Sequence, residues 1–194
     1  MSILGSPLSS SPQSQPHQDS NSNTNSSSSI LIILEEKTLI DCGGNAFDTS
    51  IAEYLEDEFS KTHENINIMN NFTAKSRVFD AAESAKIELS NSMTTTVNIP
   101  FLTADHTGPK HLVCDISRVQ LENILSKHIS TIENSLEELL TLHKGVCAVL
   151  LVGGGARMVL MKNRLQKILK DTELIVLPQP EEINAIGASY MRKF

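Results

Sequence analysis

Three polar side chains that could recognise a small molecule lie at helical spacing near the middle of the chain. Glu83, Lys86 and Ser90 are separated by three and four residues within the run 81–90. In a helix, this spacing places a carboxylate, an ammonium and a hydroxyl group on one face. The apolar residues of the same run share a neighbouring face, which we expect to pack against the core: Ala82, Ala85 and Leu89.

A second candidate element is an apolar strand that ends in three glycines, at residues 148–157. Glycines at the end of a buried strand allow the backbone to approach a ligand closely, and the helix start that follows presents N–H groups there. Gly153 and Gly154 stand at this point, and Arg157 follows them. The two elements could therefore close over one small planar molecule.

Each element also has a plain structural interpretation. The polar face of the helix could be a solvated surface, and the glycines could form an ordinary turn between a strand and a helix. No lysine follows the glycines in the manner of a P-loop, and the G-x-G-x-x-G pattern does not occur in the sequence. The two common phosphate-binding motifs are therefore absent, and the pattern alone leaves these interpretations open.

The composition narrows the classes of partner. The chain has 194 residues and a formal net charge of −7, with no tryptophan and few other aromatic residues. These properties argue against nucleic acid and anionic membranes as partners. The three cysteines are odd in number and widely spaced, which favours a reducing compartment. The longest apolar run, Val146–Val152, is too short to span a bilayer.

Residues 1–29 are dominated by Ser, Asn, Gln and Pro and contain no Lys or Arg. Such a segment buries too little apolar surface to offset its ordering entropy, so we predict a disordered tail. It has neither the charged start and apolar core of a signal peptide nor the arginines of a mitochondrial presequence. The default expectation is therefore a cytoplasmic protein.

The first ordered part should contain strands and a helix. Apolar residues within 30–40 predict one or two strands that end in a turn at Gly43 and Gly44. Asp48 or Ser50 would then begin a helix that reaches about residue 61. Ser50 followed by Glu53 fits a capping box.

The rest of the chain predicts an α/β domain. A hairpin with a loop longer than two residues should join strands at 94–100 and 110–116, and a capping box of Ser117 and Gln120 should open one helix that continues to about residue 143. The alternation of strands and helices after this point indicates an α/β fold with an inserted subdomain. The remaining expected elements are a loop at 64–71, helices at 73–90 and 159–169, strands at 148–152 and 174–177, and a last helix from residue 181.

Five segments resemble the seventy-kilodalton heat-shock chaperones, most closely the DnaK type, and they occur in the same order as in that family. The resemblance extends from about Leu34 to Phe194. It implies a fragment of an actin-like (ribonuclease H-like) ATPase domain, from its second lobe. Residues 49–116 would be the upper subdomain of that lobe, and residues 30–48 and 117–194 would belong to the lower one. The five segments are residues 43–48, 81–90, 97–112, 151–157 and 180–188.

The resemblance also implies a ligand, ATP or ADP, with Mg²⁺ bound only through the nucleotide. Glu83 and Lys86 would hydrogen-bond the ribose, and Ser90 the edge of the adenine. Ile87 would pack on one face of the base and Arg157 would lie over the other face. The backbone at Gly153 and Gly154 would approach the nucleoside, and Glu181 stands where the family usually has an aspartate.

Other parts of the family's ATPase machinery have no counterpart in this sequence: the two phosphate-binding glycine loops, the catalytic lysine and the metal-holding residues. Because phosphoryl transfer depends on positioning the γ-phosphate, the metal and the nucleophile, we predict that this chain alone does not hydrolyse ATP. The first hypothesis is therefore a truncated or divergent chaperone ATPase segment that retains an adenosine half-site.

Two further hypotheses stay open. The chain could be a non-enzymatic module that binds nucleotide-exchange factors or co-chaperones through residues 49–116, or a gene relic without a role. The DnaK-like character leaves a mitochondrion or plastid as alternative compartments. A zinc site at His106, His111 and Cys114 is a weak possibility, because three candidate ligands on one loop lack a second pair. We therefore expect surface histidines here and no metal site.

Overall fold

The computed structural model describes residues 2–5, 32–63, 66–170 and 172–191. The chain divides into two units, residues 1–38 and residues 39–194, and each is treated by itself. In the first unit, β1 (Ser2–Gly5) pairs antiparallel with β2 (Ile32–Glu36). β1 therefore lies within the segment for which the composition predicts no ordered structure. The other residues of that predicted tail lie outside the described residues.

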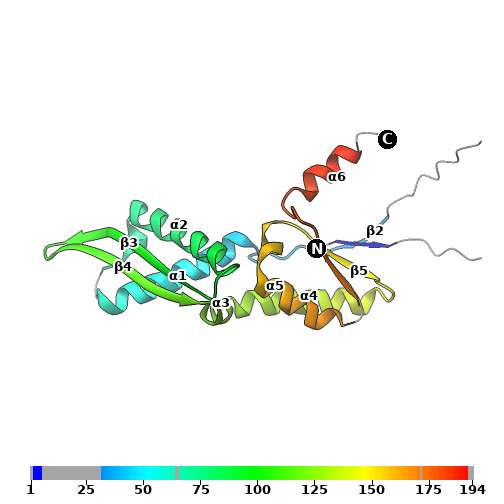
Figure 1. Ribbon diagram of the computed structural model, residues 1–194, viewed down its shortest axis with the longest axis horizontal. Coiled ribbons are helices and arrows are strands. Elements are labelled where there is room, and N and C mark those ends of the chain that lie inside the picture. Colours follow the sequence, from blue (N-terminus) through cyan, green and yellow to red (C-terminus); the bar gives the residue numbers. More distant parts are fainter. Residues whose placement is uncertain (1, 6–31, 64–65, 171, 192–194) are drawn as a thin grey trace, which may run out of the picture. The chain divides into compact units, whose positions relative to one another are not determined.

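The second unit begins with a helical hairpin that packs on a β-hairpin. Helices α1 (Gly44–Thr62) and α2 (Phe72–Leu89) are joined through a short 3-10 helix, η1 (Ile68–Asn70). Strands β3 (Thr94–Asp105) and β4 (Gly108–Ser117) pair antiparallel beside them (Figure 1). Burial alternates along both strands, so one face of the hairpin is covered and the other faces solvent.

A two-layer α/β arrangement follows. Helix α3 (Arg118–Ile124) leads into α4 (Ser126–Leu142), which packs against α5 (Val159–Leu169). Strands β5 (Ala148–Leu151) and β6 (Glu173–Val176) pair in parallel, with α5 forming the crossover between them. The 3-10 helix η2 (Gly154–Arg157) follows β5, and α6 (Ile183–Met191) ends the described chain. The fold is thus a mixture of helices and short sheets, as the α/β prediction requires.

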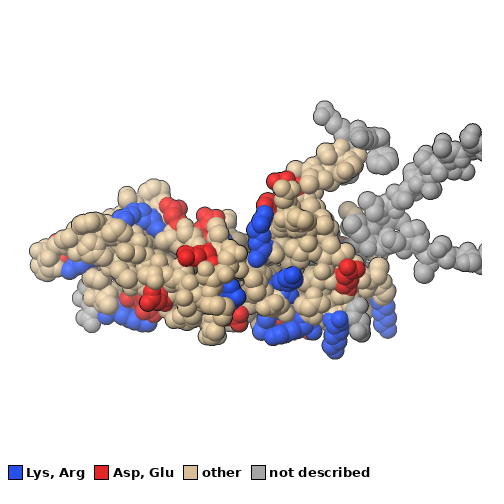
Figure 2. Space-filling view, viewed as in Figure 1, with Lys and Arg blue, Asp and Glu red and all other residues tan. Residues whose placement is uncertain are grey.

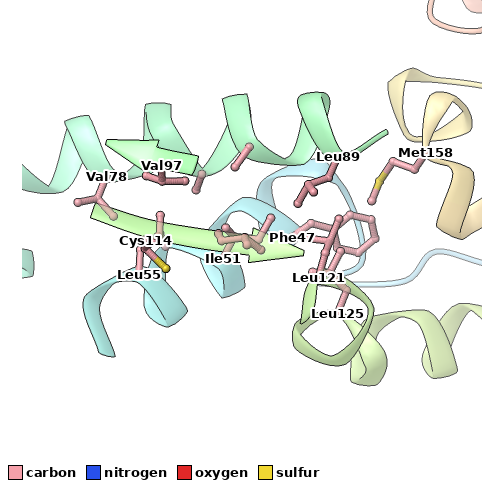
Figure 3. Packing of buried hydrophobic residues seen from close by; sticks show 14 of the residues in the cluster. Phe47, Ile51, Leu55, Val78, Leu89, Val97, Cys114, Leu121, Leu125 and Met158 are labelled. Atoms are coloured by element: carbon pink, nitrogen blue, oxygen red, sulfur yellow. The ribbon is translucent and has the colours of Figure 1, made fainter. Parts of the chain in front are cut away.

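One hydrophobic cluster runs through the second unit. It includes Phe47 and Leu55 of α1, Leu89 of α2 and Leu121 of α3, all nearly inaccessible to solvent. Figure 3 shows Phe47, Leu89 and Leu121 close together, and Leu55 farther along the cluster beside Cys114 of β4. Met158, which follows the glycine loop, belongs to the same cluster and points toward Leu89. The core therefore ties the glycine loop to the end of α2.

The start of α1 differs from the prediction. The helix begins at Gly44, and its first turn closes with a hydrogen bond of 3.0 Å from the Phe47 N–H to the Gly43 carbonyl. Gly43 has no side chain to cap the helix, so the predicted cap at Asp48 or Ser50 was wrong. The Ser50 hydroxyl instead lies 2.9 Å from Nε2 of His128 on α4.

Two other boundaries differ. The β-hairpin loop has two residues, His106 and Thr107, where a longer loop was predicted. The carboxylate of Asp105 makes this tight turn possible because it accepts hydrogen bonds from both the N–H and the hydroxyl of Thr107. The single helix predicted from residue 117 is broken at Leu125, whose side chain is fully buried.

The capping box at Ser117 was predicted correctly. The Gln120 N–H donates to the Ser117 hydroxyl, and the Gln120 side chain accepts from the Ser117 N–H at 2.8 Å.

Among the described residues, no helix is both long enough and apolar enough to cross a bilayer.

Candidate functional site

A pocket of about 650 Å³ lies where the exposed face of α2 meets the glycine loop and the segment after β6. Its walls come from four parts of the chain: the start of α1, the second half of α2, η2 with Met158, and residues 176–180. Figure 2 shows acidic and basic side chains close together near the middle of the face in view. Of the predicted site residues, six line this pocket: Glu83, Lys86, Ile87, Ser90, Gly154 and Arg157.

The α2 wall owes its orientation to the opposite side of the helix. Ala82, Ala85 and Leu89 are buried in the core, as the sequence pattern predicted. Burial of this apolar stripe turns Glu83 and Ile87 toward solvent and the pocket. Because burial of the stripe stabilises α2, the same packing that forms the core also aims the polar face.

Lys86 has a partner that the sequence did not reveal. Its Nζ lies 2.6 Å from Oδ1 and 2.7 Å from Oδ2 of Asp48, and 3.5 Å from the Gly44 carbonyl oxygen. The side chains of Lys86 and Asp48 are only 13% and 12% exposed, so the pair is largely removed from solvent. A Cβ built on Gly44 would lie 3.7 Å from Nζ of Lys86. The start of α1 therefore packs closely against the lysine and holds its ammonium at the edge of the pocket.

The two other polar side chains of the α2 wall, Ser90 and Glu83, can accept hydrogen bonds from a ligand. The Ser90 hydroxyl donates to the Lys86 carbonyl at 3.1 Å, which leaves its oxygen lone pairs available as acceptors. The exposed Glu83 carboxylate has no hydrogen-bond partner or ion pair among the described residues, so its oxygens can accept hydrogen bonds from a ligand. Ile87 is 57% exposed and offers an apolar surface.

The end of α2 is held by the first residue of α3. Arg118 donates from Nε to the Leu89 carbonyl at 3.0 Å and from Nη2 to the Ser92 carbonyl at 2.8 Å. These carbonyls lie at the C-terminus of a helix, where acceptors lack partners within the helix and a positive charge is favourable. Arg118 therefore fixes the helix end that carries Ser90.

The glycine loop forms the facing wall. Gly153 has φ = 84°, a left-handed conformation that favours glycine, and its N–H donates to the Pro180 carbonyl at 2.7 Å. One turn of 3-10 helix follows, closed by bonds from the Ala156 N–H to the Gly153 carbonyl and from the Met158 N–H to the Gly155 carbonyl. These three N–H groups already have backbone acceptors, so they are not free as the sequence predicted, whereas those of Gly154 and Gly155 have no hydrogen-bond acceptor among the described residues.

Arg157 and Glu181 form a two-pronged ion pair at the rim of the pocket. The Arg157 Nε donates to one carboxylate oxygen of Glu181 at 3.1 Å, and Nη2 donates to the other. These hydrogen bonds hold the pKa of Glu181 below its usual value and raise that of Arg157. Glu181 does not line the pocket itself, so its role in this geometry is to orient the guanidinium plane. Gly153 is likewise not one of the residues that line the pocket.

The three residues considered as possible zinc ligands, His106, His111 and Cys114, do not form a metal site in the described part of the chain. His111 receives a hydrogen bond of 2.9 Å at Nδ1 from the Phe101 N–H. Within the described part of the chain, no group of three or more His, Cys, Asp or Glu residues is arranged to hold a metal ion.

Comparison with known protein families adds an independent observation. The model of the family described as Hsp70 protein matches residues 36–192, which is more than half of the chain. The chain belongs to the Hsp70 family. Membership implies an actin-like ATPase fold, and the Hsp70 family binds ATP and ADP. The resemblance read from the five sequence segments is thereby confirmed at the level of the family.

The sequence patterns did not reveal Asp48 and Arg118, which hold the walls of the pocket without lining it, or several of the residues that line it. Asp48 follows the core residue Phe47 in a Gly-Gly-x-x-Phe-Asp segment. Because a buried carboxylate is normally paired with a positive charge, this position could have indicated a buried ion pair. The contact of Arg118 with the end of α2 could not be predicted, because an arginine in the first turn of a helix is usually a surface residue. The lining residues that were not predicted are Gly44, Asn91, Gly155, Ala156, Met158, Val176, Leu177, Pro178 and Pro180.

Proposed function

We propose that the pocket between α2 and the glycine loop binds the adenosine part of ATP or ADP, and that the chain is a divergent Hsp70 ATPase segment. The observation that carries this proposal is the meeting of two distant elements in one pocket. Glu83, Lys86, Ile87 and Ser90 come from α2, whereas Gly154 and Arg157 come from the loop after β5. Membership of a nucleotide-binding family supports the same ligand.

The hydrogen-bonding capacity of the α2 wall suits a nucleoside. Asp48 engages the Lys86 ammonium, which has three N–H groups, so a further donor is available for a ribose oxygen. The Glu83 carboxylate accepts from the ribose hydroxyls. The Ser90 oxygen, whose proton is directed to the Lys86 carbonyl, accepts from the exocyclic amine of adenine.

The base itself would lie between an apolar and a cationic surface. Ile87 packs on one face of the adenine, and the guanidinium plane of Arg157 stacks on the other. Glu181 holds that plane through both of its carboxylate oxygens, so less side-chain freedom is lost on binding. Arg157 is therefore a binding residue and Glu181 a positioning residue.

The placement of the chain within the family fold is part of the proposal. Residues 49–116 form the upper subdomain of the second lobe, and residues 30–48 with 117–194 contribute to the lower one. Mg²⁺ is bound only through the phosphates of the nucleotide. The pocket-lining residues include no group positioned to hold a γ-phosphate and an attacking water, so we propose binding without hydrolysis.

A thermal melt of the whole chain with and without ADP and Mg²⁺ tests the proposal. A ligand that binds only the folded form raises the midpoint, by an amount that grows with its concentration. We expect millimolar ADP to raise the midpoint of the wild type and not that of Arg157→Ala. Arg164→Ala is the matched control, because Arg164 also forms a two-pronged pair with a glutamate, Glu133, but does not line the pocket. Equal midpoints with and without ADP in the wild type would overturn the proposal.

A second candidate function rests on the β-hairpin. Phe101 has φ = 52° at an irregularity in the pairing of β3 with β4, and the residue is 67% exposed. Arg77 donates to the carbonyls of Pro100 and Phe101 at 2.7 and 2.8 Å, and His111 accepts from the Phe101 N–H. Phe101 is thus a strained residue whose backbone is fixed by hydrogen bonds to Arg77 and His111 and whose side chain is exposed. This combination favours a docking point for a protein partner.

We propose a nucleotide-exchange factor or co-chaperone as that partner, in agreement with the family. The test is binding of an Hsp70 nucleotide-exchange factor to immobilised chain. We expect Phe101→Ala to weaken binding and the pocket variants Lys86→Ala and Arg157→Ala to retain it. Loss of binding in the pocket variants and not in Phe101→Ala would contradict this second function.

A further inference from the structure

The hydroxyl of Ser50, in α1, is directed differently from other hydroxyls in the helices of this chain. A serine or threonine inside a helix commonly donates its hydroxyl proton to the backbone carbonyl four residues earlier. In the described helices, several hydroxyls do so: those of Thr49, Ser84, Thr131 and Thr141. The Ser50 hydroxyl lies instead 2.9 Å from Nε2 of His128 on α4. It is therefore directed at a base and not at the backbone.

The second ring nitrogen of His128 determines where the proton of the imidazole lies. Nδ1 is 3.0 Å from the backbone carbonyl oxygen of Asp41, and a carbonyl can only accept a hydrogen bond. Nδ1 therefore carries the proton of the neutral ring, which leaves Nε2 as the acceptor for the Ser50 hydroxyl. A nucleophile, a base and a group that orients the base thus follow one another, which is the arrangement of an activated serine.

The surroundings hold the imidazole in this orientation. Asp41 has φ = 56°, a left-handed conformation that is uncommon for residues other than glycine. Strained backbone of this kind persists where neighbouring contacts fix it, and it is frequent at functional sites. The buried ring of Phe47 lies against the imidazole, with the two ring centroids 5.7 Å apart. His128 is therefore positioned by a carbonyl, a hydroxyl and an aromatic ring.

We propose that Ser50 is a nucleophile activated by His128, and that the pair transfers the acyl group of small activated esters. Both residues are half-buried, so a small ester can reach them. Neither lines the pocket between α2 and the glycine loop, so this activity is separate from adenosine binding. A histidine base contributes about 10²–10⁴-fold to such a reaction. That suffices for an ester with a good leaving group, whereas a peptide bond needs oxyanion stabilisation as well.

The reaction has two steps that balance. In the first, the Ser50 oxygen attacks the ester carbonyl carbon and its proton passes to Nε2 of His128. The bond to the leaving group breaks, and the leaving group takes the proton from the imidazolium. In the second, a water molecule gives a proton to Nε2 and attacks the acyl carbon. Ser50 then leaves and recovers that proton, so the sum is hydrolysis of the ester to an acid and an alcohol.

The experiment is acylation of the whole chain by p-nitrophenyl acetate, followed by mass spectrometry of the digested chain. We expect Ser50 to be acetylated about 100-fold faster than Ser84, whose hydroxyl donates to the Asp80 carbonyl instead. Because both serines are compared in one wild-type sample, this result does not depend on the folding of a variant. Equal rates at the two serines would overturn the proposal. So would an acetyl group on Cys42 and not on Ser50, since the Cys42 Sγ lies 4.0 Å from the His128 carbonyl oxygen.

Variants test whether the histidine acts as a base. His128→Gln can still accept a hydrogen bond from Ser50 but cannot take its proton, so acetylation of Ser50 should slow by about 100-fold. Ser50→Ala should reduce the release of p-nitrophenolate, and Ser84→Ala, the matched control, should leave it unchanged. A thermal melt checks that each variant is folded. An unchanged rate at Ser50 in folded His128→Gln would show that exposure alone sets its reactivity, and would contradict the proposal.

Discussion

The ammonium nitrogen of Lys86 lies 2.6 and 2.7 Å from the two carboxylate oxygens of Asp48, at the edge of the pocket. This contact joins α2 to the start of α1 across 38 residues of sequence. The contact places the Lys86 side chain, from the polar face of α2, against Asp48, which is buried beside the core. The pair therefore couples the stability of the fold to the shape of the proposed adenosine site.

Replacement of Asp48 by asparagine should destabilise the protein by about 2 kcal/mol, because the largely buried ammonium of Lys86 would lose its counter-charge. Urea denaturation measures the change. Glu58→Gln is the control, since Glu58 pairs with the exposed Lys61 at 2.6 Å and exposed pairs contribute little. Similar shifts of the urea midpoint in both variants would contradict a special role for the buried pair.

The two glycines of the loop should respond differently to alanine. Gly153→Ala should lower the free energy of unfolding by about 1 kcal/mol or more, because its φ of 84° disfavours a side chain. Gly154 has negative φ, and a Cβ built there meets nothing within 4 Å. Gly154→Ala should therefore fold normally and weaken only the binding of adenosine. A larger loss of stability in Gly154→Ala than in Gly153→Ala would show that the loop geometry is wrong.

Arg118 should affect both stability and binding. Arg118→Met keeps the aliphatic stem and removes two hydrogen bonds to the end of α2, at a cost of about 1–2 kcal/mol. Because Ser90 lies at that helix end, the affinity for adenosine should also fall. Arg77→Met is the matched control: it loses two bonds to the carbonyls of Pro100 and Phe101, away from the pocket. Its stability should fall while its affinity for adenosine stays unchanged.

The turn of the β-hairpin should persist in acid. Hydrogen bonds from the hydroxyl and N–H of Thr107 lower the pKa of Asp105 from its usual 3.8 to about 2. Because the folded value lies below the unfolded one, the stabilisation is complete above about pH 4 and is lost as the pH falls through about 2. The Thr107 amide resonance, followed by NMR as a function of pH, should report this low midpoint. A midpoint near 4 would contradict the turn geometry.

The parts of the fold that were predictable depend on local patterns. The apolar stripe of α2, the two strands of the β3–β4 hairpin, and the capping box at Ser117 are each set by residues close in sequence. Their physical causes act over one or two turns of chain, so a pattern suffices to predict them. The polar face of α2 was predicted for the same reason.

The features that were missed depend on contacts between distant residues. The break at Leu125 carries neither Gly nor Pro, and it coincides with a side chain that is fully buried in the core. The start of α1 at Gly44 lacks a side-chain cap, while Ser50, which resembles one, hydrogen-bonds His128. Likewise the partners of Lys86 and Arg157 are visible only once the chain is folded.

The most direct test of the central claim is an NMR titration of the isotope-labelled chain with adenosine. The account predicts that backbone amides of both walls, residues 87–91 and residues 153–157, shift together with one dissociation constant, while amides of the β-hairpin turn do not. Shifts confined to one wall, or no shifts with millimolar adenosine, would contradict the claim that these two elements form one adenosine site.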